Sequence, residues 1–156
     1  AGASAGTGIR ATRFGAAPVA PGPFPFSRDV AVDISLAELA AAAVREGCLA
    51  ETLGAHVAAV AAERAPEPEI RADLRAIADE EATHAVLSFR IVAWALRVGG
   101  ADVATAVRAA FAEPCPALDL QELARRSNVP LAELQVAARA GVVDVIQPAA
   151  QRLLAA

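Results

Sequence analysis

Two long stretches without proline, separated by one short proline-rich turn, constrain this chain more than any other feature. The first covers residues 33–65 and the second covers residues 69–98, with Pro66 and Pro68 between them. Proline interrupts a continuous helix because it lacks the backbone N–H and clashes with the preceding turn. Each stretch carries apolar residues at helical spacing and predicts a helix of about thirty residues, roughly 45 Å long. A short turn makes the two helices an antiparallel αα-hairpin.

The ends of these helices carry recognisable signals. Ser35 and Glu38 have the spacing of a capping box at the start of the first helix. Pro68 suits the first turn of the second helix, and Gly99-Gly100 is typical of a helix end. The hairpin is therefore expected to occupy residues 33–98.

The rest of the chain divides into segments of different character. Residues 101–156 predict shorter helices separated by prolines, so residues 31–156 are expected to form one all-α domain. Residues 1–30 are rich in Gly, Ala and Pro and predict an extended arm or linker. Cys48 and Cys115 are too few for a disulfide framework or a zinc knuckle, and small buried side chains are expected at both positions.

Charge and hydropathy exclude two classes of function. The net charge is -4, from 14 basic and 18 acidic residues, which argues against nucleic acid as the main partner. No run of about 18 apolar residues lacks a charge, so no transmembrane helix is expected.

The motif Glu81-x-x-His84 places a carboxylate and an imidazole three residues apart in the second helix. Residues three apart share one face of a helix, so both side chains can reach one metal ion. Helix bundles that bind two iron or manganese ions pair this motif with a Glu from a neighbouring helix. A helical wheel at about 100° per residue puts Glu81 and His84 on the apolar face that is expected to be buried.

The first helix offers two glutamates as the partner. On the same wheel Glu46 falls within about 60° of the apolar residues and Glu51 about 140° away, on the polar side. A carboxylate in an apolar stripe is costly unless it is paired or bound to metal. Counting along both helices from the turn places Glu46 and Glu81 at similar depth. Glu46, Glu81 and His84 are therefore predicted to meet at one level of the hairpin.

Several strings together resemble the C-terminal half of bacterial ferritin-like domain proteins. They are Glu-Gly-Cys-x-x-Glu-Thr-Leu at 46–53, Glu-Glu-x-x-His-Ala at 80–85, Trp-Ala-Leu at 94–96 and Pro-Gly-Pro-Phe-Pro at 21–25. The resemblance covers residues 21–98 and implies a four-helix bundle that binds two irons.

In that family each helix pair supplies a Glu and an E-x-x-H motif. Carried over position by position, the resemblance implies Glu46, Glu81 and His84 as metal ligands. Glu51 is a secondary candidate, because its string matches the family although its wheel angle is poor.

The chain departs from the family in one respect, because it carries one ligand set where the family has two. Three explanations stay open. A second copy supplies the missing ligands by twofold pairing, an upstream hairpin has been cut away and the chain is a fragment, or the chain binds at most one metal ion. Since one hairpin leaves the stripe half covered, association is expected.

The resemblance implies an oxidoreductase or ferroxidase-like function, with two iron or manganese ions shared between hairpins. The sequence contains no tyrosine, which argues against a tyrosyl-radical enzyme. The alternative is a non-catalytic helical scaffold or interaction module, in which Glu46, Glu81 and His84 form a polar network that fixes helix register. A soluble protein of the bacterial cytoplasm and a processed exported protein both remain open.

Overall fold

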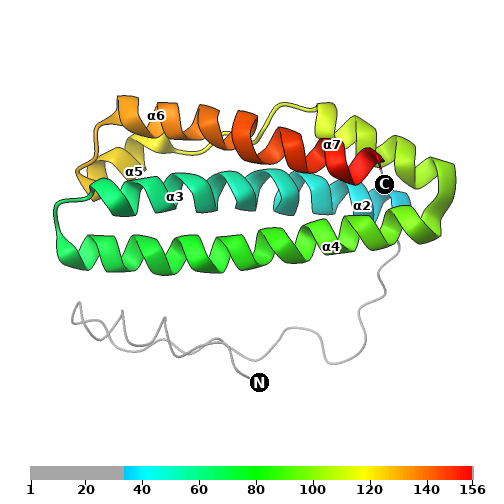
Figure 1. The fold of residues 1–156 in the computed structure, drawn as a ribbon, viewed down its shortest axis with the longest axis horizontal. Coiled ribbons are helices and arrows are strands. Elements are labelled where there is room, and N and C mark those ends of the chain that lie inside the picture. The colour runs from blue at the N-terminus through cyan, green and yellow to red at the C-terminus, as the bar shows by residue number, and fades with distance from the viewer. Residues whose placement is uncertain (1–33, 156) are drawn as a thin grey trace, which may run out of the picture. The chain divides into compact units, whose positions relative to one another are not determined.

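The computed structural model describes residues 34–155 and shows an all-α fold. Within this range all regular structure is helical, as the periodicity predicts, and no strand is present (Figure 1). The arm or linker predicted for residues 1–30 lies outside the described residues.

The first arm of the hairpin is one continuous helical rod made of three segments. They are α2 (Leu36–Ala42), the π-helical segment η1 (Ala43–Glu51) and α3 (Thr52–Arg64). The predicted capping box starts it: the Glu38 N–H donates to Ser35 Oγ at 3.2 Å, and the Ser35 N–H donates to the Glu38 carboxylate at 2.8 Å. The π-helical segment was not predicted, and it changes which side chains face the second arm.

The second arm is α4 (Pro68–Ala112), and a three-residue turn connects it to α3. Arg71 holds this turn, because its Nη1 donates to the carbonyl oxygens of Ala65 at 2.9 Å and Pro66 at 2.8 Å. The predicted stop at Gly99-Gly100 is a kink. Gly100 has φ 66° and ψ -155°, a conformation that glycine adopts readily, and the helix resumes beyond it.

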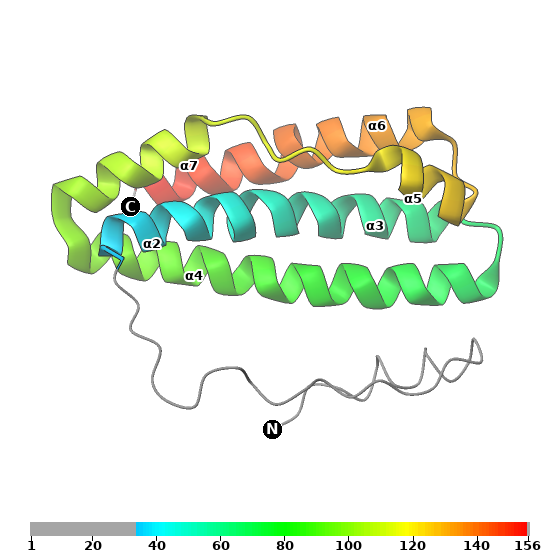
Figure 2. The same cartoon turned by 180° about the vertical axis from the view of Figure 1, so that it is seen from behind.

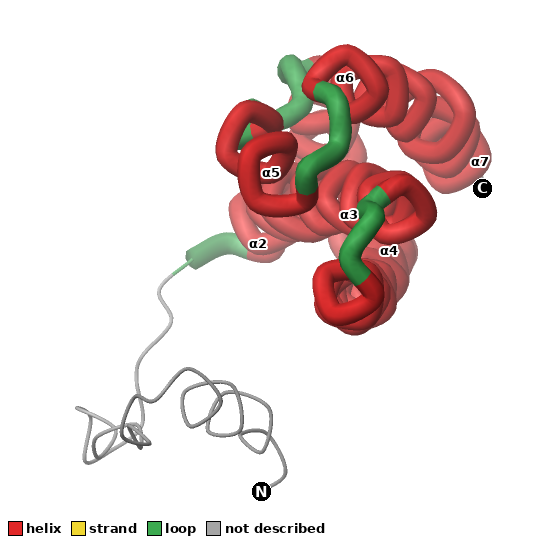
Figure 3. The backbone as a smooth tube through the Cα atoms, turned by 90° about the vertical axis from the view of Figure 1, so that its left-hand side faces the viewer, coloured by secondary structure: helices red, strands yellow, loops and turns green. Residues whose placement is uncertain are grey.

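The C-terminal part folds back along the first arm. It consists of α5 (Leu120–Ser127), α6 (Leu131–Ala140), the π-helical segment η2 (Gly141–Ile146) and α7 (Gln147–Ala155). The link from α4 to α5, residues 113–119, runs alongside the middle part of the hairpin (Figure 2). Viewed from the end, α3 lies between α4 and α6 (Figure 3). Helix α3 is therefore covered on both sides.

The core lies where the first arm meets α4 and the C-terminal helices. Its largest fully buried side chains are mostly small aliphatics, which suits close helix packing: Val44, Cys48, Val57, Val92, Val107 and Leu134. At Gly47 the two arms approach so closely that an added Cβ would overlap the Ser88 side chain. A Cβ at Gly54 would lie 3.5 Å from Glu81 Oε2, which is an ordinary contact.

These two glycines give a matched test of the packing. Gly47→Ala should destabilise the protein by about 1–3 kcal/mol, because overpacking at Ser88 outweighs the gain in helix propensity. Gly54→Ala should be neutral or stabilising by up to about 1 kcal/mol. Urea unfolding followed by circular dichroism measures both, and equal effects of the two substitutions would contradict the close approach at Gly47.

Candidate functional site

Three polar side chains meet between η1/α3 and α4, about midway along the hairpin. Gly47 faces Ser88 and Gly54 faces Glu81, which sets the register of the two antiparallel arms. Between these contacts, Glu51 Oε2 lies 3.6 Å from His84 Nδ1. Glu51, Glu81 and His84 thus form one group, referred to below as the acid–histidine cluster.

The two carboxyl groups of the cluster interact directly, and Glu51 changes the pKa of Glu81. A hydrogen bond with Glu51 is the largest of the influences that raise the pKa of Glu81 to about 7, followed by burial and the charge of Glu51. The nearby His84 acts in the opposite direction, and the charge of Glu80 adds a smaller upward effect. Two carboxylates this close cannot both ionise without cost, so Glu81 holds its proton near neutral pH.

One carboxylate oxygen of the cluster accepts no hydrogen bond. Glu51 Oε2 is buried and takes part in no hydrogen bond among residues 34–155. A buried carboxylate oxygen without a hydrogen bond is costly, and the contact with His84 at 3.6 Å is too long to replace the hydrogen bonds that water would have given. The site is therefore suited to an added positive charge or hydrogen-bond donor.

The cluster opens to solvent at His84, which the wheel placed on the buried face. The His84 side chain is 51% exposed, whereas that of Glu51 is 30% exposed. The position of α6 explains why His84 is exposed, because α6 packs on the opposite side of α3 from α4 and so does not cover α4 (Figure 3). The prediction that His84 is buried is wrong for the single chain, and Glu81 is only partly buried.

The structure also reverses the predicted positions of the two partner glutamates. Glu46, expected in the apolar stripe, is exposed, and Glu51, expected on the polar side, is half-buried in the cluster. Segment η1 is the physical reason. In a π-helix the backbone hydrogen bonds join residues i and i+5 instead of i and i+4. The additional residue in the turn rotates the residues that follow by about 100° relative to an α-helical wheel.

The register separates Glu46 from the motif as well. Glu51 lies opposite His84, so Glu46 falls level with residue 89, about two turns from Glu81. Glu51 and Glu81 lie equally far in sequence from Pro66, on either side of it. A partner for Glu81 chosen at the same number of residues from the turn would therefore be Glu51, not Glu46. The ligand role of Glu46 stays a prediction, but the structure does not bring it to the cluster.

The cluster supplies the donor types of a metal centre without completing one. Carboxylate and imidazole groups suit iron and manganese, and a buried Glu51 oxygen that accepts no hydrogen bond fits a cation. In the described part of the chain, however, no group of three or more His, Cys, Asp or Glu side chains is arranged to hold a metal ion. One chain therefore offers an incomplete donor set.

Neither cysteine contributes to the cluster. Burial raises the pKa of the Cys48 thiol to about 12, so it stays protonated at neutral pH. Cys48 is buried as expected, whereas Cys115 is only half-buried, and burial raises its pKa too.

Among the described helices, none is long and apolar enough to cross a membrane.

Comparison with known proteins found no match: no family model matches the chain, and searches of curated proteins and of solved structures returned none. The likeness to ferritin-like proteins therefore rests on the sequence motifs alone.

The raised pKa of Glu81 predicts how stability changes with pH in protein kept metal-free with a chelator. The folded state holds the Glu81 proton more tightly than the unfolded chain, whose glutamate has a pKa near 4.5. This contribution is complete below about pH 4.5 and is lost as the pH rises through 7. Glu81→Gln keeps a neutral group beside Glu51 and should therefore raise Tm above that of the wild type at pH 8 but not at pH 4.

Thermal melting by circular dichroism between pH 4 and pH 8 measures this difference. Glu63→Gln is the matched control, because it removes the same charge from an exposed position on α3. The Glu63 variant should show no such gain at high pH. A Glu81→Gln effect of equal size at both ends of the pH range would contradict the coupling between Glu51 and Glu81.

Proposed function

We propose that this chain is a ferritin-like metal-binding protein whose acid–histidine cluster is one half of a two-ion centre. The observation that carries the proposal is the cluster itself, in which Glu51 and Glu81 share one level of the hairpin with His84. A divalent cation would bind Glu51 Oε2, which accepts no hydrogen bond within residues 34–155, and would remove the repulsion between the carboxylates. Proton loss from Glu81 would accompany binding, because a ligating carboxylate is ionised.

A second hairpin would complete the donor set. Helix α4 exposes large apolar side chains on both sides of Glu81 and His84 along the chain, including Ile77, Leu87 and Trp94. Leu87 and Trp94 are seven residues apart and therefore lie on one side of α4, and an exposed apolar face is typical of interaction sites. A second copy packed against this face would cover it and bring its own carboxylates and imidazole to the cluster. A hairpin elsewhere in a longer chain would supply the same groups.

Iron or manganese matches the proposed donors, and a bound redox metal would supply the oxidoreductase or ferroxidase-like chemistry. The residues of this chain would bind and orient the ions: Glu51 and Glu81 from facing arms, and His84 at the solvent-exposed edge. The sequence has no tyrosine, so no tyrosine of this chain relays electrons to the site.

A second candidate function is a non-catalytic helical scaffold or interaction module. The hydrogen bond between Glu51 and Glu81 favours it, because a protonated Glu81 satisfies part of the cluster without any metal. The absence of a complete three-residue donor group in residues 34–155 is also consistent with it. The cluster would then fix the register of the two arms.

Anaerobic titration of the purified protein with Fe(II) or Mn(II), followed by metal analysis, separates the two functions. The metal-binding proposal predicts about one ion per chain, and a Tm that falls when a chelator removes the metal. Glu51→Ala, Glu81→Ala and His84→Ala should each weaken binding by at least about tenfold, since each removes a ligand. Glu63→Ala should bind like the wild type.

Metal content far below one ion per chain, unchanged by Glu81→Ala, would contradict the proposal and favour the scaffold. Glu46→Ala tests the remaining ligand prediction in the same titration. A loss equal to that of Glu51→Ala would assign Glu46 to the centre of the assembled protein, whereas wild-type affinity would exclude it as a ligand.

A further inference from the structure

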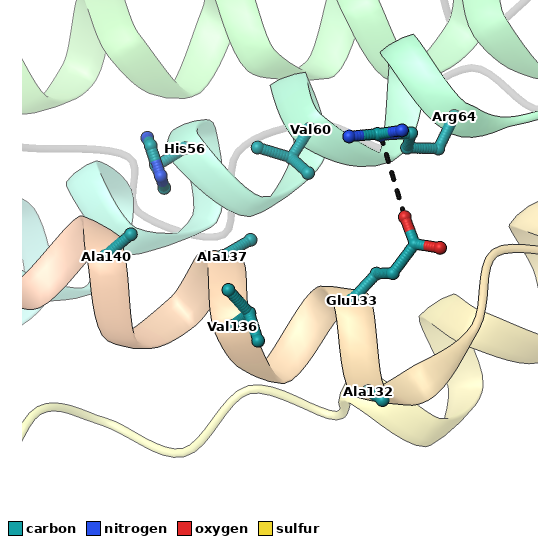
Figure 4. Close-up of a pocket in the computed structure, with 8 residues that line it drawn as sticks. All are labelled: His56, Val60, Arg64, Ala132, Glu133, Val136, Ala137 and Ala140. Carbon is teal, nitrogen blue, oxygen red and sulfur yellow. Dashed lines mark ion pairs between the residues drawn. The ribbon is translucent and has the colours of Figure 1, made fainter.

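A hollow lies on the side of α3 that faces α6, away from the α3–α4 interface. Its volume is about 420 Å³, within the range of roughly 300–1,000 Å³ typical of small-molecule sites. Figure 4 shows its lining, which comes from the two helices alone: His56, Val60, Arg64, Ala132, Glu133, Val136, Ala137 and Ala140.

The local sequence explains why these helices leave a gap. At the start of η2 they touch, because a Cβ added to Gly141 would lie 3.2 Å from Leu53 Cδ1 and 3.1 Å from His56 Cδ2. Beyond this contact α6 presents Ala137 and Ala140, whose side chains are too short to fill the space. The result is a trough between α3 and α6 that is narrowest near His56.

The trough has an apolar middle and polar ends. Val60, Val136 and Ala137 lie between His56 at one end and the Arg64–Glu133 pair at the other (Figure 4). His56 and Arg64 are eight residues apart on α3, about 12 Å along the helix. An extended chain of about ten carbons, with single bonds of ~1.5 Å, has this length.

Arg64 is available to an incoming anion. Its Nε lies 3.6 Å from Glu133 Oε2, and the two side chains are 63% and 45% exposed. Such a pair is weak, and the guanidinium has five N–H donors, most of which this contact leaves unused. A guanidinium binds a carboxylate or a phosphate in a two-point contact, and of the two the singly charged carboxylate is repelled less by the neighbouring Glu133.

We propose that this trough binds a straight-chain amphipathic carboxylate of about ten carbons. The alkyl chain lies over Val60 and Ala137 towards His56, and the carboxylate contacts Arg64. Burial of the alkyl chain supplies most of the affinity, because the middle of the trough is lined by apolar side chains. Glu133 opposes the ligand charge, so it limits the affinity that Arg64 provides.

Calorimetric titration of the full chain with decanoate tests the proposal. We expect one decanoate per chain, with decanol binding more weakly because it lacks the charge. Arg64→Gln should weaken decanoate binding by at least about fivefold, whereas Glu133→Gln should strengthen it, since it removes the repulsion. If the Arg64–Glu133 ion pair had only a structural role, both substitutions would change the decanoate affinity in the same direction.

Arg139→Gln and Asp144→Asn are matched controls, because both positions are exposed and lie outside the trough. Both should bind decanoate like the wild type. Ala140→Leu should abolish binding by filling the trough. Should that variant not fold, the exposed Arg64 and Glu133 variants still decide the question.

Three results would overturn the proposal. They are no binding of decanoate to the wild type, shifts of Arg64→Gln and Glu133→Gln in the same direction, and tighter binding of decyltrimethylammonium than of decanoate.

Discussion

The close approach of Gly47 to Ser88 is the contact on which the rest of the hairpin depends. No other residue type fits there without displacing α4, so it sets how far apart the two arms lie and how they are aligned. Once this register is set, Glu51 must lie opposite His84, and Glu81 must lie over Gly54. The acid–histidine cluster is thus a consequence of helix packing. The repulsion between Glu51 and Glu81 lowers the free energy of unfolding, and the packing of the hairpin offsets it.

Periodicity and chain breakers predicted most of the fold. The hairpin, the capping box at Ser35 and the break at Gly100 follow from local physical rules, and the structure contains all three. The positions of Glu46 and Glu51 did not follow, because a helical wheel assumes 3.6 residues per turn and η1 departs from it. Nothing in composition or spacing signals a π-helical segment. His84 was predicted to be buried because a helical wheel identifies the apolar face of a helix but not which other helices pack against that face.

Helix α3 separates two sides of different character. On the α4 side lies the polar cluster, formed by Glu51 at the end of η1 with Glu81 and His84 of α4, and α4 itself exposes Leu87 and Trp94. Towards α6 it carries an apolar trough whose polar groups lie at its ends. Small residues determine the packing on both sides. Gly47 allows close contact with α4, whereas Ala137 and Ala140 of α6 leave a hollow because their side chains do not fill the space beside α3. The proposed association surface on α4 and the proposed small-molecule trough between α3 and α6 therefore share no residue.

The pKa of Glu81, measured by carboxyl-carbon NMR in metal-free protein, tests the central claim most directly. The hairpin register predicts a value of about 7 in the wild type, because Glu51 holds the proton on Glu81. It predicts the same value in Glu46→Gln and a clearly lower one in Glu51→Gln, where the repelling charge is gone. A Glu81 pKa that responds to Glu46→Gln but not to Glu51→Gln would contradict the π-helical register and the cluster built on it.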